Sequence, residues 1–175
     1  IVNTAIEEQV DLVIFAGDAY KDRSPAPTFQ REWGRRIMRL SRAKIPTILL
    51  TGNHDIAPSH QRAHAIQEFD TLEVPYVHVV YQPALLGPNE LDGLPVQVLA
   101  IPWITRAGVA SLLENTPANE KDPNKIIEDA IANLIQTAIQ ALDPNLPAIL
   151  AAHASISGAV FGNEQTIKLG RDVLL

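Results

Sequence analysis

Short apolar runs alternate with amphipathic stretches in the first third of the chain. Residues 12–16 and 47–50 are unbroken, β-branched runs bounded by polar loops, which is typical of strands buried on both faces. Residues 28–43 lie between them and keep apolar side chains at helical spacing, and residues 1–9 read as the end of an amphipathic helix. The alternation predicts an α/β fold, in which active sites usually lie at the carboxyl ends of the strands.

The middle of the chain gives weaker signals. Residues 59–72 predict another helix. Residues 76–81 and 96–101 are β-like and are separated by a turn rich in Pro, Gly and Asn rather than by a helix. Two such strands without a helix between them favour an antiparallel pair.

The last third predicts one long helix and one more strand. Residues 123–142 carry an apolar stripe of Ile, Leu and Ala that Pro144 ends, and residues 147–152 form another apolar run, which we expect to be a buried strand ending at His153. No repeat, low-complexity tract or interdomain linker is present, so the sequence predicts one domain over residues 1–175.

Composition narrows the class of protein. An apolar fraction of 46% with 19% charged residues excludes a disordered chain, and the absence of cysteine excludes a disulfide scaffold, a thiolate zinc site and a cysteine nucleophile. It also fits a reducing compartment, so we expect a cytoplasmic protein. No apolar run reaches the roughly 18 residues of a membrane span, and no membrane partner is expected.

Three predicted strands end in side chains that ligate metals. Gly17-Asp18 follows the first strand, Gly52-Asn53-His54-Asp55 the second, and His153 the last. Their oxygen and nitrogen donors suit manganese, iron, zinc or magnesium, and a carboxylate such as Asp18 can bridge two ions. Two of the motifs also have simpler explanations, because a Gly-Asp turn and a satisfied strand-end histidine are both common. The motif Gly52-Asn53-His54-Asp55 is harder to explain as a simple turn.

Taken in order, these motifs resemble the central motifs of the calcineurin-like metallophosphoesterases. Residues 11–20, 45–55 and 149–158 are further similar to the SbcD nucleases, the nuclease subunits of SbcCD complexes, and the resemblance covers roughly residues 1–172. It implies a metallo-dependent phosphatase-like αββα sandwich of two mixed sheets. It also implies a role for each motif residue.

By this resemblance, Asp18 is the bridging carboxylate, and Asn53 and His153 ligate the second of two divalent ions. His54 contacts the scissile phosphate and protonates the leaving oxygen, and Asp55 orients His54 by accepting its other ring N–H. The implied ions are manganese first, with magnesium, iron or zinc as alternatives.

The implied activity is metal-dependent phosphodiester hydrolysis of DNA by a repair and recombination nuclease, exonuclease or endonuclease. The implied partners are DNA, an SbcC-like SMC-type ATPase and a second copy in a homodimer. Two alternatives stay open: a phosphatase or cyclic-nucleotide phosphodiesterase of the same fold, and a non-catalytic relic or scaffold.

Two motifs of the family are absent from these 175 residues, namely the upstream Asp-x-His and the downstream Gly-His-x-His. We therefore expect a phosphoesterase domain incomplete at both ends, with weak or partial metal occupancy and little activity. Among the other histidines, His60 and His64 are four apart, a zinc-like spacing that a solvated helix face also explains. His78 lies among valines, and we expect no ligand role for it.

The chain is acidic overall but contains one basic segment. The chain has 14 Lys and Arg against 20 Asp and Glu, a net charge of −6. Residues 28–44 carry six cations and a single acid, a net of +5, so the rest of the chain stands at −11. Such a helix could follow a phosphate backbone, or it could be a solvated helix paired with acidic neighbours.

Overall fold

A computed structural model gives the structure of the chain, which forms two compact units. Residues Ile1–Trp103 and Pro144–His153 make the first unit, and Ile104–Asp143 and Ala154–Leu175 make the second. All three strand-end motifs belong to the first unit. The structure describes residues 1–22, 24–56, 64–104, 123–155, 160–161 and 165–166.

The first sheet is parallel throughout. Its order is β1 (Val13–Phe15), β2 (Thr47–Leu50) and β3 (Val77–Val80), with Val13 beside Thr47 and Thr47 beside Val77. The central strand β2 is buried along its whole length, as predicted, whereas β1 is only half-buried.

The second sheet is mixed. It runs β4 (Ala84–Leu86), β5 (Gln97–Ile101) and β6 (Ala148–Ala152), with β4 antiparallel and β6 parallel to β5. The predicted pairing of residues 76–81 with 96–101 is therefore wrong, because the two segments lie in different sheets. β3 pairs with β2 in the first sheet. The antiparallel neighbour of β5 is instead the short strand β4.

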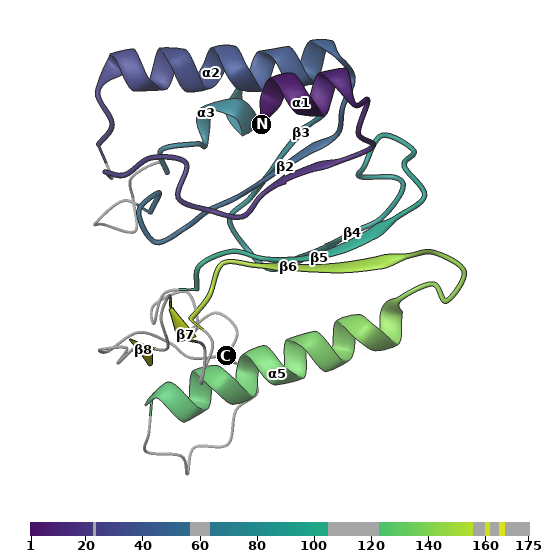
Figure 1. Cartoon of the computed structure of the whole chain (residues 1–175). Helices are drawn as coiled ribbons and strands as arrows, with labels where there is room; N and C mark the ends of the chain where they lie inside the picture. Colours follow the sequence, from purple (N-terminus) through teal and green to yellow (C-terminus); the bar gives the residue numbers. More distant parts are fainter. Residues whose placement is uncertain (23, 57–63, 105–122, 156–159, 162–164, 167–175) are drawn as a thin grey trace. The chain divides into compact units, whose positions relative to one another are not determined.

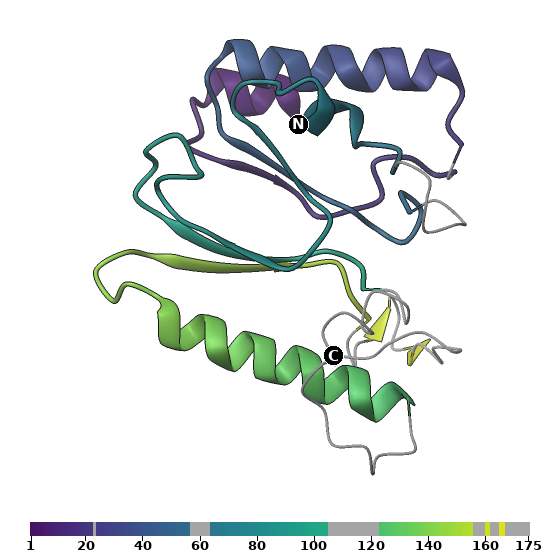
Figure 2. The same ribbon diagram turned by 180° about the vertical axis from the view of Figure 1, so that it is seen from behind.

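Helices cover one face of the first sheet, and the second sheet covers the other (Figures 1 and 2). The helices are α1 (Val2–Glu7), α2 (Pro27–Arg42) and α3 (Glu68–Thr71). This arrangement confirms the predicted α/β sandwich, and α2 confirms the helix predicted over residues 28–43. Phe29 keeps the helical spacing of the apolar stripe but is 67% exposed, so it lies outside the core.

The alternation of side chains along β2 divides the core into two layers. Ile48 and Leu50 pack between the sheets against Val98 of β5, while Leu49 faces the helices and packs with Ile37 of α2. The motif residues that follow β2 are thus attached to the most buried strand of the fold.

Two further expectations need correction. Of residues 64–72, only Glu68–Thr71 is helical, and residues 57–63, with His60, lie outside the described part. Strand β6 is only partly buried: Ala151 packs in the core, but Ile149 is 40% and Leu150 57% exposed. In the described residues β6 is an edge strand of its sheet.

The second unit contains the long helix α5 (Pro123–Ala141), as predicted, and a hairpin of β7 (Val160–Phe161) and β8 (Gln165–Thr166). Ile127 and Ile131 are buried together on α5, but its stripe is not buried throughout, since Ile139 is 58% exposed. None of the helices in the described residues has the length and apolar character that crossing a bilayer requires.

Candidate metal centre

The ends of strands from both sheets meet at one place. Asp18 follows β1, Asn53 follows β2, and His153 follows β6. Two backbone hydrogen bonds tie these ends down: the amide of Trp103 donates to the Thr51 carbonyl at 2.8 Å, and the amide of His153 donates to the Ile101 carbonyl at 2.9 Å. Side chains from three separate strands are therefore held around one point.

The imidazole of His153 has a fixed orientation. Its Nδ1 lies 2.6 Å from the carbonyl oxygen of Ala16, which can only accept, so Nδ1 carries the hydrogen. In the neutral ring this leaves the lone pair on Nε2, the form that binds metals. Nε2 lies 3.1 Å from Oδ1 of Asn53 and 3.7 Å from Oδ1 of Asp18. The edge of the Trp103 ring supports the imidazole, with centroids 5.9 Å apart.

These donors fit a divalent cation. Metal–ligand bonds of about 2.1 Å place two donors about 3.0 Å apart at a right angle and about 3.6 Å apart at 120°. The two distances from Nε2 of His153 match these values. A carboxylate, an amide oxygen and an imidazole also form a mixed donor set that Mn²⁺, Fe²⁺ or Zn²⁺ accepts. Without a cation or a proton between them, the Nε2 lone pair and the Asn53 oxygen repel each other.

The cluster needs the side-chain amide of Asn53 to reach three metal donors. Within the described part of the chain, no group of three or more His, Cys, Asp or Glu side chains could hold a metal. Asp18 and His153 supply two such side chains, and the Asn53 amide supplies the third donor. The described residues thus offer a partial coordination sphere.

Two glycines make room for the cluster. A Cβ on Gly17 would overlap the His153 ring, and a Cβ on Gly52 would overlap both the carboxylate and the amide of Asp18. Gly17 also has a φ of +97°, and Asp18 follows it with a φ of +55°, a left-handed conformation that Asp tolerates better than most residues. The backbone therefore carries strain at the point where it directs the Asp18 carboxylate.

The second motif also positions Asp18. The backbone amide of His54 donates to Oδ1 of Asp18 at 3.0 Å, so the carboxylate is held by the backbone of the neighbouring loop. The His54 side chain itself is exposed. Its imidazole is thus free to meet a molecule that arrives from solvent.

Asp55 does not orient His54, contrary to the expected role. Its side chain is only 1% exposed and points inward, where Oδ2 accepts hydrogen bonds from the amides of Gly52 at 2.8 Å and Ala19 at 3.4 Å. His54 points to solvent, so the two neighbouring side chains diverge. Burial raises the pKa of the Asp55 carboxyl, and the amide donors only partly oppose this shift. Asp55 is a brace between the two ligand-bearing loops.

The brace leads to a first prediction. Asp55→Ala leaves the buried Gly52 amide without its acceptor, and we expect the free energy of unfolding to fall by about 1–3 kcal/mol. Asp55→Asn keeps an oxygen for that amide and should cost less than half as much. Urea unfolding of both variants measures the difference. Equal losses would show that hydrogen bonding by Asp55 does not hold the loops.

His64 is half-buried rather than on a fully solvated face. Its Nδ1 is buried with no hydrogen-bond partner in the described residues, and the amide of Ala65 donates to the backbone carbonyl of Asp55 at 3.1 Å. Burial lowers the pKa of His64, while the charge of Asp55 acts in the opposite direction. Burial likewise raises the pKa of Tyr20 and of Glu68 nearby.

The lowered pKa of His64 makes the free energy of unfolding depend on pH in a definite direction. As the pH falls below the unfolded-state pKa of about 6.5, the unfolded chain takes up a proton that the folded chain resists, so stability falls. His64→Phe removes this titration and should flatten the loss of stability between about pH 7.5 and about pH 5.5. Urea unfolding at the two pH values tests this. A loss as steep as in the wild-type chain would contradict it.

His78 pairs with an acidic side chain that is not among the predicted site residues. Its Nε2 lies 3.0 Å from Oδ2 of Asp92, which links β3 to the loop before β5. His60 falls outside the described residues, so the solvated helix face expected for it stays a prediction.

Two parts of the centre escaped prediction from the sequence. The first is the Ala16 carbonyl, which sets the tautomer of His153, and no sequence pattern identifies a backbone acceptor. The second is Trp103, at the end of β5. A signal for Trp103 was available, because Pro102-Trp103 closes an apolar run as the other motifs do.

The sequence profile of the calcineurin-like phosphoesterase family matches residues 1–173. The chain therefore belongs to the calcineurin-like phosphoesterases, which are hydrolases, and the predicted family is confirmed. Among curated proteins, it is 27% identical to the DNA double-strand break repair protein Mre11 of Thermoplasma acidophilum, over 82% of this chain and 36% of that protein. It is also 27% identical to the SbcD component of the nuclease SbcCD of Rhodobacter capsulatus, over 95% of this chain and 44% of that protein. The chain spans less than half the length of both relatives.

Proposed function

We propose that this chain carries metal-binding and catalytic residues of a metal-dependent phosphodiesterase that acts on DNA. The observation that carries the proposal is that Nε2 of His153 lies 3.1 Å from Oδ1 of Asn53 and 3.7 Å from Oδ1 of Asp18, two distances that fit donors on one cation. Family membership supports phosphoester hydrolysis, and the two relatives, named for DNA repair and nuclease activity, support DNA as the substrate.

Each residue has a distinct part in the proposed reaction. Asn53, His153 and Asp18 would hold divalent metal ions. Such ions, when bound, neutralise and polarise the phosphate. Water attacks phosphorus and the bond to the leaving oxygen breaks, while His54 gives that oxygen a proton; the proton that the water loses passes to solvent, from which His54 is reprotonated. The exposed His54 side chain and its fixed backbone suit this part.

The proposed partners follow from the relatives rather than from the geometry. Similarity to the SbcD component of an SbcCD nuclease supports an SbcC-like SMC-type ATPase as a candidate partner, and a homodimer stays a prediction. Manganese is the first candidate metal, with magnesium, iron and zinc behind it. The cytoplasm stays the expected location.

The ligand count of this chain leads to a further expectation. Three donors serve one ion, but for the other ion the motifs supply only Asp18, so we expect the 175-residue chain to bind a metal pair weakly and to hydrolyse DNA slowly. A clear Mn²⁺-dependent nuclease activity from this chain alone would contradict that expectation.

The experiment that tests the function uses the product of the whole reading frame that contains these 175 codons. It should be assayed with Mn²⁺ on duplex DNA, single-stranded DNA, a phosphomonoester and a cyclic nucleotide. We expect DNA cleavage to dominate. Preference for the monoester or the cyclic nucleotide would instead establish the phosphatase or phosphodiesterase alternative, and inactivity with every substrate would establish the relic.

A further inference from the structure

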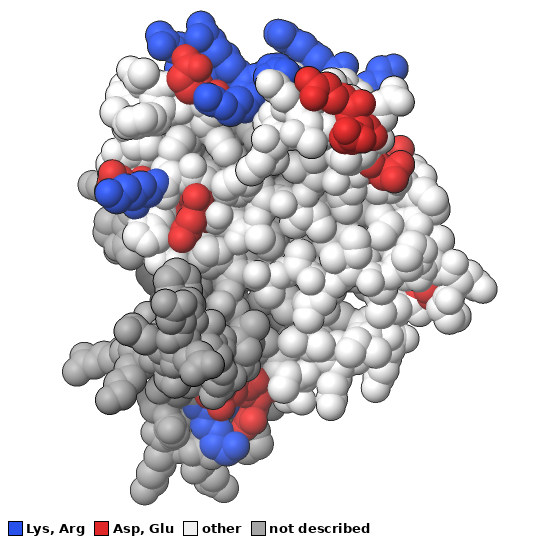
Figure 3. Space-filling view, viewed as in Figure 1, with Lys and Arg blue, Asp and Glu red and all other residues white. Residues whose placement is uncertain are grey.

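A row of cations lies along the outer face of α2, where Lys and Arg gather over the helix (Figure 3). All of these side chains are exposed, and Glu32 is the single acid among them. Five of the six are arginines, whose planar guanidinium groups match phosphate oxygens in pairs. The cations are Arg31, Arg35, Arg36, Arg39, Arg42 and Lys44.

Four of the arginines lie on one side of α2, and the opposite side of the helix is buried, so these arginines stay on the solvent side. With about 3.6 residues per turn, four of its arginines fall within a sector of about 80° and span about 16 Å of helix axis. On the opposite face, Ile37 and Leu40 are buried, 3% and 1% exposed, which anchors the helix to the first unit. The four are Arg31, Arg35, Arg39 and Arg42.

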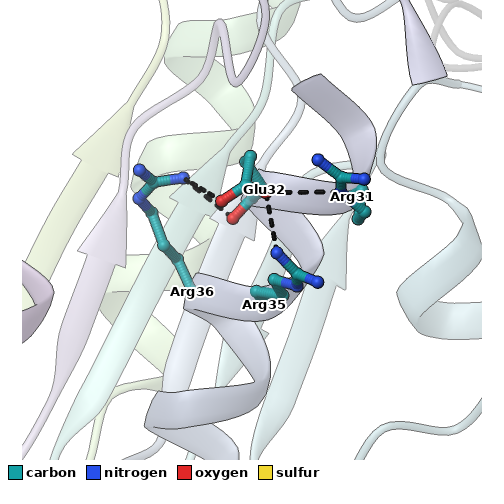
Figure 4. Close-up of polar contacts among 4 residues, drawn as sticks. All are labelled: Arg31, Glu32, Arg35 and Arg36. Atoms are coloured by element: carbon teal, nitrogen blue, oxygen red, sulfur yellow. Dashed lines mark hydrogen bonds and ion pairs between the residues drawn. The ribbon is translucent and has the colours of Figure 1, made fainter. Parts of the chain in front are cut away.

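The carboxylate of Glu32 forms ion pairs with the arginines in the first half of the row (Figure 4). Oε1 of Glu32 lies 2.9 Å from Arg35 and 3.3 Å from Arg31, and its Oε2 lies 4.0 Å from Arg36. These three arginines are more than half exposed, so the ion pairs are screened by water and contribute little stability. Two positive charges therefore remain unbalanced there, and a phosphate can replace the contact with Glu32.

The second half has no acidic partner. Among the described residues, no ion pair involves Arg39 or Arg42. Both lie in the last turn of α2, where the helix dipole favours cations. The dipole does not explain the cations in the first half, and like charges four residues apart, such as Arg35 and Arg39, destabilise a helix. A helix that only faces solvent has no need of such a row of arginines. A binding site for an anionic ligand does need one.

We propose that this row binds the sugar-phosphate backbone of nucleic acid and guides it to the metal centre. The proposal rests on the proposed function for its choice of ligand. A duplex presents phosphates every 3.4 Å of rise on each strand, so about 16 Å of helix faces about five of them. Because α2 connects the end of β1 to the start of β2, its first turn lies toward the strand ends that carry Asp18 and Asn53 (Figure 1).

The test measures binding of the 175-residue chain to a short fluorescein-labelled duplex by fluorescence anisotropy. The buffer contains EDTA and a series of KCl concentrations. Arg39→Gln with Arg42→Gln should lower the affinity about tenfold at low salt and reduce the slope of log K against log salt by about two. Arg39→Lys with Arg42→Lys should keep the slope. Lys125→Glu, on α5, makes the same change in net charge at a residue that is not part of the row.

The outcomes separate this proposal from the function of the centre. If the glutamine pair binds no more weakly than Lys125→Glu, or if the wild-type chain does not bind duplex at low salt, the row is only a solvated helix face and the proposal is overturned. Circular dichroism shows whether each variant is folded. Because EDTA prevents hydrolysis, the binding result does not depend on the nuclease assay, and either proposal can fail while the other holds.

Discussion

Gly52→Ala is expected to lower the melting temperature of the chain by about 2–12 °C and to displace Asp18. The added Cβ would overlap the Asp18 carboxylate and backbone amide, and neither has room to move freely, since the carboxylate is fixed by the His54 amide. Forcing a methyl group into a packed site costs about 1–3 kcal/mol, and each kcal/mol shifts the melting temperature by about 2–4 °C at this size. Circular dichroism during heating measures the shift.

Gly34→Ala is the matched control. Gly34 lies within α2, and a Cβ there meets no atom within 4 Å. Alanine is the better helix former, so this variant should gain about 0.5–1 kcal/mol. If both variants melted at the same temperature, the close approach of Gly52 to Asp18 would not be a packing constraint.

His54→Gln should lower kcat for DNA about 10²- to 10⁴-fold in the product of the whole reading frame. The proposed acid is lost, but the backbone amide that holds Asp18 remains, so Mn²⁺ affinity should not change. An ester of p-nitrophenol has a leaving group that needs little protonation, and its hydrolysis should fall much less. Steady-state rates with the two substrates measure the split.

His78→Gln serves as the control for this experiment, because it changes a histidine that pairs with Asp92 instead of facing the metal centre. Its rates should match those of the unmodified enzyme. Equal losses on DNA and on the p-nitrophenyl ester in His54→Gln would show that His54 is not the proton donor.

The sequence predicted the parts of the fold that have a strong local period. The buried β2 and the amphipathic α2 are both set by their own side chains. The pairing of β3 and β5 was wrong because strands of similar composition can join either sheet, and the choice depends on packing across the sandwich. The exposure of β6 has a similar origin, since a central strand and an edge strand can share one sequence pattern.

The candidate metal centre could likewise be predicted from the sequence only in part. Glycine followed by Asp or Asn at strand ends located Asp18 and Asn53, and Nε2 of His153 meets them. The role of Asp55 could not be predicted from its place beside His54. Side-chain direction in a loop follows the backbone angles of each residue, and here Asp55 points into the core while His54 points out.

Titration of the 175-residue chain with Mn²⁺, followed by electron paramagnetic resonance, tests the central claim most directly. The wild-type chain and His78→Ala, which removes a histidine elsewhere, should each show one saturable site. In His153→Ala that site should weaken at least about tenfold, because the imidazole is one of three donors. Equal Mn²⁺ affinity in all three proteins would contradict the assignment of Asp18, Asn53 and His153 as a metal centre.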